Sequence, residues 1–442
     1  MGGAVGGGAM DGFLRCGRGA VPIPSLPPGC TVRRLARDDV PAVDDVAGSA
    51  RRLLCHPTSG PPLRDIVRAG ETVAVAVSDA TRLWFPTREF LPTIIAELRE
   101  CGVRDEDIRI LVAVGTHRRA TEQDMVAIVG EEVAAAFSVT NHDCDDQAGL
   151  VHLGATSRGT PVWVNRTAME ADRLILTGAV TFHNLAGFSG GPKSILPGLS
   201  SRETVQTNHL QFLLPERGAG FDPAVCSANL TGNPIHEDML EAARLAAPDF
   251  VFNVTVNSQG RIAAMFAGEL AETHRAASRW QLETFAVPFA EPADLVLASC
   301  GGVPRDMNLY QAYKGMRSAM RVVRPGGLVV LYAECPEGTG NAEMEELLLW
   351  DVDLVSKEDS VRSRYTNARA IAFVMAVWLK QARVALLSGL DPDLVKRMGF
   401  IPSRDAGEVS ALLAQSGQGI DSCFVIPTGA AILPVPGTGS AA

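Results

Sequence analysis

The glycine-rich segment of residues 181–198 holds the most distinctive set of reactive residues in this sequence. Its centre reads Gly-Phe-Ser-Gly-Gly-Pro-Lys, and His183 stands ten residues before Lys193. Glycines permit positive φ angles and a close approach of the backbone, so successive amide groups can surround an anion. Lys193 adds a positive charge or an amine nucleophile. The combination is more specific than an ordinary glycine turn and predicts a binding loop.

A phosphate-binding loop of the form Gly-x4-Gly-Lys-Ser/Thr is the first alternative interpretation of this segment. Counted from Gly187, the second glycine of that motif falls on Pro192, which has no N–H group to donate to a phosphate. A phosphate-loop nucleotide-dependent transferase therefore stays as the alternative hypothesis, although the motif does not match at this required glycine.

Charged residues also follow the apolar stretch at residues 73–77. Asp79 and Arg82 stand three residues apart, so both can face one ligand. Asp79 would then be directed toward hydroxyl groups and Arg82 toward a carboxylate or phosphate. Taken alone, the pair fits an aspartate helix cap beside a surface arginine equally well or better.

Two further histidines occupy positions suited to chemistry. His117 follows the apolar stretch at residues 108–114 and precedes a helix start at Thr121, where a general acid or base is well placed because its unperturbed pKa lies near neutrality. His209 is expected on a helix that begins with the capping-box sequence Ser200-Ser-Arg-Glu. Each histidine taken singly has a structural alternative.

A fourth stretch lies in the second half of the chain. An expected strand at residues 294–298 leads into Cys-Gly-Gly-Val-Pro and then into a helix for which Asn308 is a reasonable N-cap. Gln311 and Lys314 are three residues apart and share one face of that helix. Such a pair is usually solvated, but here it lies one turn beyond the carboxyl end of a strand, where ligands bind.

The order of these motifs resembles the nickel-pincer lactate racemase family, whose members racemise or epimerise 2-hydroxy acids. The matching stretches are Ser-Asp-Ala-Thr-Arg (78–82), Gly-Thr-His-Arg (115–118), the segment 183–198, Asn-His (208–209) and Tyr-Gln-Ala-Tyr-Lys (310–314). The Gly-Phe-Ser-Gly-Gly-x-Lys core is the specific element, and the others gain weight from their common order. Beyond about residue 320 no catalytic motif is identified.

The resemblance implies a cofactor and a metal. The family cofactor is a pyridinium-3-thioamide-5-thiocarboxylic acid mononucleotide that holds nickel between two sulfurs and a carbon. Carried over to this sequence, its thioamide is attached to Lys193 and His209 takes the remaining nickel position. Soft sulfur donors with an imidazole suit Ni(II) better than Mg or Ca.

The resemblance also implies roles for the other residues. His117 and His183 form the acid/base pair, and Arg82 and Lys314 bind the substrate carboxylate. Four further residues are assigned to the cofactor, Asp79, Ser189, Gly190 and Gly191, and two to the substrate, Tyr310 and Gln311. Which of Asp79 and Gln311 supports the cofactor and which supports the substrate is left open.

A hydride route agrees with these assignments. The α-proton of a 2-hydroxy acid is weakly acidic, so one histidine can remove the hydroxyl proton while hydride moves to the cofactor. The flat 2-keto acid can accept hydride back on either face. The expected activity is therefore that of an isomerase, with a small 2-hydroxy acid and cofactor-assembly enzymes as partners.

Alternation of β-branched runs with amphipathic stretches predicts an α/β fold of two domains, with mainly parallel sheets flanked by helices and the active site in the interdomain cleft. Strands are predicted at residues 72–77, 108–114, 173–176, 250–256, 294–298, 327–332 and 423–426. Helices are predicted at residues 88–101, 121–129, 202–213, 237–246, 308–323 and 361–379.

The chain is divided as follows from composition and element order. Residues 1–28 are expected to be a flexible Gly/Pro-rich extension, 29–287 an N-terminal α/β domain with the cofactor loop, and 288–418 a C-terminal α/β domain. Residues 419–442 are expected to return to the N-terminal domain and end in a tail.

Composition excludes several classes of protein. Forty Lys plus Arg against fifty Asp plus Glu leave a net charge of −10, which argues against a general nucleic-acid or anionic-membrane binder. The longest apolar run, residues 370–379, is too short to span a bilayer. Nine scattered cysteines without a Cys-x-x-Cys pair favour a reducing cytoplasm.

Two other interpretations stay open. A non-catalytic sensor of small acids on the same scaffold is disfavoured because both acid/base histidines are present. The acidic cluster from His142 to Asp146 with His152 could bind a metal, but its short spacing more often marks a solvated turn.

Overall fold

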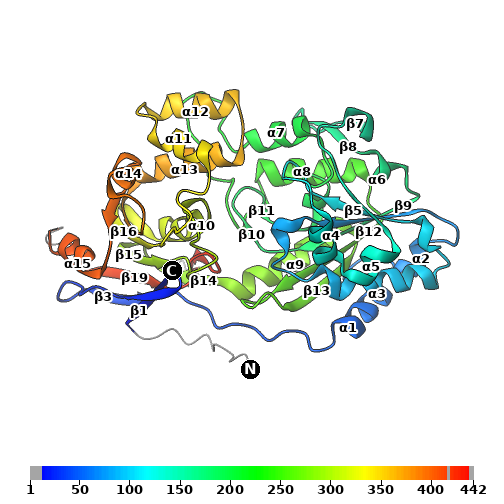
Figure 1. Cartoon of the computed structure of the whole chain (residues 1–442), viewed down its shortest axis with the longest axis horizontal. Helices are drawn as coiled ribbons and strands as arrows, with labels where there is room; N and C mark the ends of the chain where they lie inside the picture. The colour runs from blue at the N-terminus through cyan, green and yellow to red at the C-terminus, as the bar shows by residue number, and fades with distance from the viewer. Residues whose placement is uncertain (1–11, 416–418, 438–442) are drawn as a thin grey trace, which may run out of the picture. The chain divides into compact units, whose positions relative to one another are not determined.

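The computed structural model describes residues 12–415 and 419–437, which fall into two compact units, each with its own sheet (Figure 1). The first unit contains residues 39–215 and 221–284. The second unit contains the described residues up to 38, residues 216–220 and the described residues from 285 onward. The sequence predicts a boundary at residue 288, and the second unit resumes at residue 285.

The first unit is built on a six-stranded sheet of order β13-β12-β9-β4-β5-β6, parallel except for β13 at one edge. Its strands are β4 (Val73–Ser78), β5 (Ile108–Ala113), β6 (Ser138–Asn141), β9 (Arg173–Ala179), β12 (Phe250–Val256) and β13 (Ile262–Gly268), with the hairpins β7 (Leu150–Ala155)–β8 (Pro161–Asn165) and β10 (Phe182–His183)–β11 (Gly187–Phe188) beside it. Its helices are α1 (Val46–Cys55), α2 (Leu63–Ile66), α3 (Thr87–Glu100), α4 (Glu122–Val129), α5 (Glu131–Ala136), α6 (Arg166–Glu170), α7 (Arg202–Leu210), α8 (Pro234–Ala246) and α9 (Leu270–Phe285).

The core of the first unit explains why these strands are so apolar. Val73 to Val77 of β4 are fully buried, as expected for a strand covered on both faces in a parallel sheet. On one face Phe252 stacks on Phe90 of α3 with ring centroids 5.1 Å apart. This packing fixes the central strands, so the residues that follow them are held at one edge.

The second unit has a six-stranded parallel sheet of order β18-β17-β16-β15-β19-β3. Its strands are β1 (Phe13–Cys16), β2 (Gly19–Pro22), β3 (Thr31–Arg34), β14 (Ala286–Phe289), β15 (Ala293–Ser299), β16 (Val323–Tyr332), β17 (Arg383–Leu387), β18 (Ile401–Ser403), β19 (Ser422–Ile426) and β20 (Leu433–Pro436). Its helices are α10 (Leu309–Met320), α11 (Ala342–Leu349), α12 (Leu354–Ser363), α13 (Asn367–Gln381), α14 (Pro392–Arg397) and α15 (Ala406–Gln415). The predicted fold class, two α/β domains with mainly parallel sheets, is confirmed by this architecture.

The last strand corrects one prediction. Residues 419–442 were expected to return to the N-terminal domain, but β19 pairs with β15 and β3 in the sheet of the second unit. The crossing segment is instead the N-terminal one, because β3 supplies the edge of that sheet. The continuous apolar run of residues 423–426 marks β19 as a strand but does not specify its partner.

The predicted flexible extension needs correction as well. Residues 1–11 lie outside the described residues, but residues 13–22 form the β1–β2 hairpin. Leu14 and Cys16 are buried in the core of the second unit, which a glycine-rich context concealed. The hairpin is therefore part of the folded domain.

The predicted helix over residues 361–379 is two helices. α12 ends at Ser363, and α13 begins after Thr366, whose hydroxyl accepts a hydrogen bond from the Arg369 amide. A threonine N-cap ends one helical pattern and starts another. None of the helices in the described ranges is long and apolar enough to cross a bilayer.

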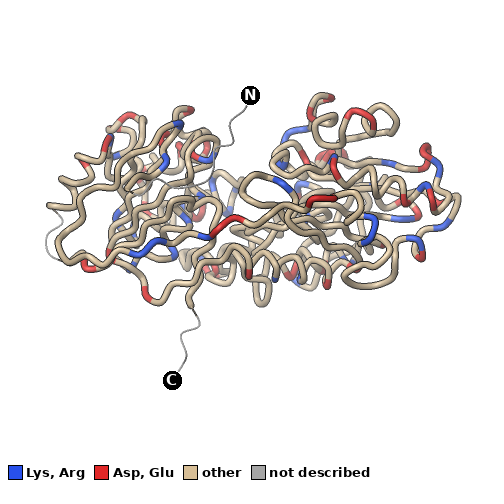
Figure 2. The backbone as a smooth tube through the Cα atoms, turned by 90° about the horizontal axis from the view of Figure 1, so that it is seen from below, with Lys and Arg blue, Asp and Glu red and all other residues tan. Residues whose placement is uncertain are grey.

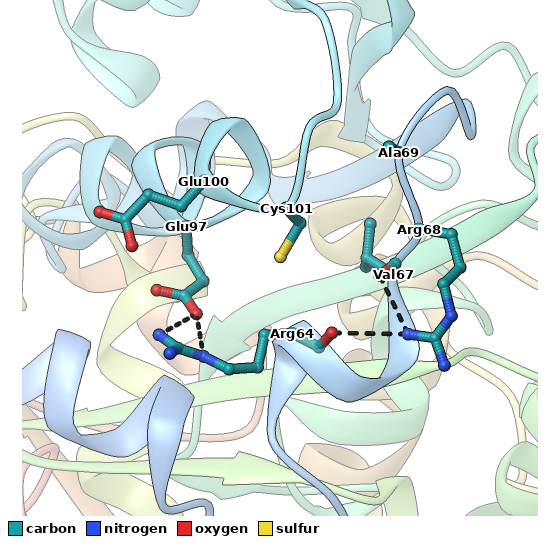
Figure 3. Close-up of a pocket in the computed structure, with 7 residues that line it drawn as sticks. All are labelled: Arg64, Val67, Arg68, Ala69, Glu97, Glu100 and Cys101. Atoms are coloured by element: carbon teal, nitrogen blue, oxygen red, sulfur yellow. Dashed lines mark hydrogen bonds and ion pairs between the residues drawn. The ribbon is translucent and has the colours of Figure 1, made fainter.

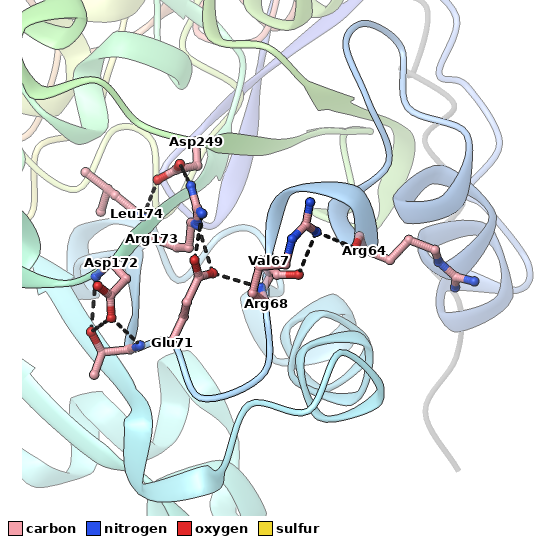
Figure 4. A network of polar contacts seen from close by, with 9 residues as sticks. Arg64, Val67, Arg68, Glu71, Asp172, Arg173, Leu174 and Asp249 are labelled. Carbon is pink, nitrogen blue, oxygen red and sulfur yellow. Dashed lines mark hydrogen bonds and ion pairs between the residues drawn. The ribbon is translucent and has the colours of Figure 1, made fainter.

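Acidic and basic residues are spread over both units, as Figure 2 shows. At the amino end of the first sheet they pair with each other. Arg173, at the start of β9, contacts the carboxylates of Glu71 at 2.7 Å and Asp249 at 2.9 Å (Figure 4). Asp172 accepts hydrogen bonds from the amide and hydroxyl of Thr72. This end of the sheet is closed by satisfied polar groups.

Candidate functional site

The carboxyl ends of β4 and β5 bring two predicted residues together. The parallel register pairs Ser78 with Ala113, so Asp79 and the turn with His117 leave the sheet at the same edge. His117 Nδ1 lies 2.6 Å from Asp79 Oδ2. The sequence analysis assigned Asp79 to the cofactor, whereas its observed partner is the predicted acid/base histidine.

The Asp79 carboxylate is held ionised. Burial alone would raise its pKa, but the hydrogen bond and charge of His117, with the Thr81 hydroxyl at 2.7 Å, outweigh burial and lower the pKa below its ordinary value. An ionised carboxylate can only accept, so His117 carries its proton on Nδ1. Its Nε2 then has a free lone pair on a side chain that is 39% exposed. This arrangement suits a general base.

Arg82 lies in the short helical turn Ala80–Arg82 that follows β4. Its Nη1 donates to the Thr81 hydroxyl at 3.2 Å, which links the guanidinium to Asp79 through one side chain. Arg82 is half-buried, and its charge also acts on Lys193. The structure therefore gathers Asp79, Arg82 and His117 at one strand end.

The glycine-rich segment lies over the ends of β9 and β12 and is fixed from below. Gly190 and Gly191 have φ angles of +74° and +52°, which favour glycine. The Gly191 amide donates to the buried Asn253 Oδ1 at 2.9 Å, and a Cβ on Gly191 would meet the His274 ring at 2.6 Å. No larger residue fits there without moving this ring.

The predicted anion nest is wrong for part of this loop. The Ser189 amide donates to Thr181, the Gly191 amide to Asn253, and the Lys193 amide to the Gly190 carbonyl. These three amides serve the loop's own conformation, so they are not available to a phosphate. The rival phosphate-loop interpretation loses donors at these positions as well as at Pro192.

Lys193 lies in the short helical turn Gly191–Ser194, with its amine in an unusual setting. Burial, and to a lesser extent the charge of Arg82, lower its pKa from 10.5 to about 7. About half of the Lys193 amines are therefore uncharged near neutral pH. An uncharged amine is nucleophilic, which is what a covalent attachment requires.

His209 is a buried residue near the end of α7. The helix begins at Arg202 because the Ser201 side chain accepts a hydrogen bond from the Thr204 amide. Burial, followed by the charges of Lys193 and His117, lowers the pKa of His209 to about 3. Its imidazole is therefore neutral at neutral pH, the form that binds metals.

His183 has the opposite hydrogen-bond pattern from His117. It sits in the β10–β11 hairpin, where its Nδ1 accepts from the amides of Leu185 at 3.2 Å and Ala186 at 3.1 Å. In the neutral ring the proton is then on Nε2. His183 therefore presents a donor at Nε2, where His117 presents an acceptor.

The other predicted substrate residues lie on α10 in the second unit. Asn308 caps this helix by accepting from the Gln311 amide at 3.0 Å. Lys314 Nζ donates to Gln311 Oε1 at 2.9 Å, so the two side chains share a face as the spacing predicted. Tyr310 lies one residue before Gln311, in the first turn of α10.

Sequence reasoning missed the residues beneath the loop. His274 Nε2 lies 3.0 Å from the Ser189 carbonyl, and its ring stacks on His236 with centroids 5.6 Å apart. Burial first, and then positive neighbours, lower the pKa of His236 to about 4 and that of His274 to about 3. Neutral rings can pack beside Lys193 without adding charge. The sequence Asn-Pro-Ile-His at the start of α8 was the available signal.

Other candidate sites prove structural. His142 is buried, with Nε2 at 2.9 Å from the Ser200 carbonyl, and no group of His, Cys, Asp or Glu suited to a metal occurs among the described residues. A hollow between α2 and α3 is lined by residues that bind each other, with Arg64 held to the buried Glu97 at 2.8 Å (Figure 3). Neither feature includes a residue of the glycine-rich segment.

Comparisons with known proteins cover most of the chain. Residues 17–220 match the family description "Lactate racemase N-terminal domain", and residues 289–433 match "Lactate racemase C-terminal domain". A curated lactate racemase from Lactiplantibacillus plantarum is 31% identical over 87% of this chain and 90% of that protein. One from Thermoanaerobacterium thermosaccharolyticum is 29% identical over 87% of this chain and 89% of that protein.

Solved structures agree. The lactate racemase apoprotein from Thermoanaerobacterium thermosaccharolyticum superposes with a TM-score of 0.85 at 28% identity, covering 96% of this chain and 99% of that chain. A protein from Thermotoga maritima has a TM-score of 0.61 at 16% identity, covering 90% of this chain and all of that one. The second likeness shows the fold alone.

Proposed function

Because the chain belongs to the lactate racemase family, a family of isomerases, we propose that it racemises a small 2-hydroxy acid. The single observation that carries this proposal is the 2.6 Å contact between His117 and Asp79 at the strand end that also holds Arg82. It combines an oriented base with a cation for a carboxylate. A 2-hydroxy acid needs both groups.

The residues present fit the family's nickel-pincer nucleotide. Lys193 offers an amine that is half neutral near pH 7, and His209 offers a neutral imidazole. Gly190 and Gly191 let the loop before Lys193 pack closely on Val180, Asn253 and His274, where a Cβ would clash. We propose that Lys193 holds the nucleotide covalently and that His209 binds its nickel. The bound group supplies the acceptance and return of the substrate's α-hydride.

The chain's own residues then handle the proton. His117 Nε2 takes the proton of the substrate hydroxyl, the positive charge on its ring is stabilised by Asp79 at Nδ1, and the carbon left behind becomes a planar 2-keto acid. Return of the proton and the hydride regenerates the hydroxy acid. Arg82 holds the carboxylate throughout, and rotation about the bond between the carboxylate carbon and C2 presents the other face of the keto acid.

The two histidines are set up differently for this exchange. Neutral His117 accepts at Nε2, whereas neutral His183 donates at Nε2 because its Nδ1 is occupied by two backbone amides. We propose that His183 donates a hydrogen bond from Nε2 to the substrate oxygen. For the other enantiomer we propose that its ring turns away from these two amides, so that its proton lies on Nδ1 and Nε2 takes the hydroxyl proton. The proposal also assigns Tyr310, Gln311 and Lys314 of α10 to substrate binding, with Ser189 and its neighbouring glycines beside the nucleotide.

The proposal implies further partners and a compartment. The nucleotide must be made and loaded by cofactor-assembly enzymes. All nine cysteines are free thiols, which supports the reducing cytoplasm as the location. Nucleic acid and membrane are not proposed as partners.

A chirality assay tests this function. The protein, produced together with the assembly enzymes, is given single enantiomers of lactate, malate, longer 2-hydroxy acids and sugar acids, and the opposite enantiomer is measured over time. We expect racemisation of at least one of them and its loss in His117→Ala and His183→Ala, with nickel content retained. Unchanged turnover in either variant would remove that histidine from the mechanism.

A further inference from the structure

A buried carboxylate lies directly against the helix that carries His209. Asp238 of α8 is fully buried. Its Oδ2 accepts hydrogen bonds from Asn208 Nδ2 at 2.8 Å and from Gln211 Nε2 at 2.9 Å. These two donors immediately flank His209 at the end of α7, one residue before it and two residues after it.

The other contacts of Asp238 lead away from α7. Its Oδ1 accepts from the Thr156 hydroxyl at 2.5 Å, and its Oδ2 also accepts from the Thr160 hydroxyl at 2.8 Å. Both threonines belong to the tight turn between β7 and β8, in which the Thr156 amide donates to the Thr160 carbonyl at 3.0 Å. One carboxylate therefore ties the end of α7 to α8 and to a rigid hairpin turn.

The side-chain amide oxygens of the two donors are left without hydrogen bonds by this arrangement. Asn208 Oδ1 and Gln211 Oε1 are buried and accept no hydrogen bond from any residue that the structure describes. A buried unsatisfied carbonyl is unfavourable, and rotating either amide would place its oxygen against the carboxylate instead. Both amides thus turn their N–H groups toward Asp238, so the carboxylate sets the orientation of the two side chains.

We propose that Asp238 is a positioning residue that fixes the last turn of α7 and thereby the direction of the His209 imidazole. The inference rests on the proposed role of His209 as the nickel ligand. A metal ligand must keep its ring orientation within narrow limits, and groups behind the ligand usually provide that restraint. Here the restraint acts through the backbone between Asn208 and Gln211.

The first test is hydrogen exchange in the cofactor-free protein. Asp238→Asn keeps the shape but leaves one acceptor oxygen where two oxygens now accept hydrogen bonds from four donors. We expect the amides of residues 208–210 to exchange about tenfold faster, because the hydrogen bonds that restrain Asn208 and Gln211 are weakened. The matched control is Asp249→Asn at the amino end of the six-stranded sheet of the first unit, where Asp249 binds Arg173. This variant should leave the exchange of residues 208–210 unchanged. Equal exchange in the two variants would overturn the proposal.

The second test is nickel retention after loading. Asp238→Asn should release nickel faster than the control and shift the visible absorption of the bound metal, changes that a general loss of stability would not produce. If Asp238→Asn does not fold, Gln211→Met removes one donor and should show the same changes at a smaller size. Nickel release and absorption identical to the control would contradict the positioning role.

His209→Ala separates this inference from the proposed function. If His209→Ala binds nickel as well as the unmodified protein, the proposed role of His209 is wrong and the positioning inference falls with it. If His209→Ala loses nickel while Asp238→Asn matches its control in exchange and release, the proposed function stands and only the role of Asp238 is wrong.

Discussion

The two ends of the first sheet treat charge in opposite ways. At the amino end, Arg173 is paired with both Glu71 and Asp249 (Figure 4). At the carboxyl end, each charge that shifts the pKa of Lys193 or His209 is positive. The same strands, β4 and β9, connect the two ends.

The charges at the amino end are satisfied by each other, whereas the carboxyl end keeps groups with shifted pKa values that could bind a further molecule. Paired charges at the amino end stabilise the sheet by themselves. At the carboxyl end, burial first and then positive neighbours lower the pKa values of Lys193 and His209, so these two side chains give up protons more readily. Perturbed groups gathered in this way are typical of functional sites. Neutral nitrogen donors are suited to attachment and metal binding.

The sharpest contrast is between one carboxylate at each end. Asp79→Asn removes the acceptor that fixes the His117 tautomer and stabilises its charged form, so we expect racemisation to fall by roughly 10²–10⁴-fold. Nickel and nucleotide content should stay the same. The control Glu71→Gln, at the amino end, should change racemisation less than about threefold. Equal losses of turnover in both variants would erase the contrast.

A smaller loss is expected when the loop is released from beneath. Asn253→Leu removes the acceptor of the Gly191 amide, so Lys193 loses its fixed approach and racemisation should fall about tenfold or more. Thr255→Val is the matched control, because Thr255 is buried two residues along β12 and its hydroxyl has no hydrogen-bond partner within residues 12–415 and 419–437. Modified Lys193 should also accumulate more slowly only in Asn253→Leu. Identical accumulation in the two variants would show that the loop holds its shape without Asn253.

At the amino end the expected effect is on stability alone. Arg173→Met leaves Glu71 and Asp249 without their shared cation, and we expect the free energy of unfolding to fall by about 2 kcal/mol, discounted for the partial exposure of these side chains. Racemisation per folded molecule should be unchanged. Denaturant unfolding and a turnover assay below the unfolding transition check both statements. A large loss of turnover would mean that the two ends are not independent.

The last prediction concerns how the stability of the folded protein depends on pH. Between about pH 7 and 10.5 the unfolded chain holds a proton on Lys193 that the cofactor-free folded chain does not, so this group makes stability rise with pH in that window. Lys193→Met removes the contribution. The variant should be more stable than the unmodified protein by up to about 5 kcal/mol at pH 6, with the gain disappearing toward pH 10. A gain that is constant across this range would contradict a depressed lysine pKa.

Local patterns predicted the elements that carry the site. The apolar run before Asp79 and the one before His117 are β4 and β5, and the segment around Lys193 is the loop at the end of β9. Their contact could not be predicted, because the 2.6 Å pairing of residues 38 positions apart depends on the strand register. Sequence spacing specifies a helix face but not a partner across a sheet.

Long-range partners explain the other failures. Asn253 lies in an apolar strand and Asp238 in an amphipathic helix, where a single polar residue resembles an ordinary exposed position until its neighbours are known. In the same way, the edge strand β3 pairs with β19, and the buried Leu14 packs against the same sheet, whose other strands lie hundreds of residues further along the chain. The chemistry of the site was visible in residue types, whereas the parts that hold it were not.

The mass of the protein, and of the peptide that contains Lys193, tests most directly whether Lys193 carries the nucleotide. The protein and Lys193→Ala are each produced with the cofactor-assembly enzymes, and intact mass, peptide mapping, nickel content and racemisation are measured on the same samples. The account predicts an adduct on Lys193 with about one nickel per chain in the active protein, and none of these in the variant. Racemisation by a protein whose Lys193 is unmodified would contradict it.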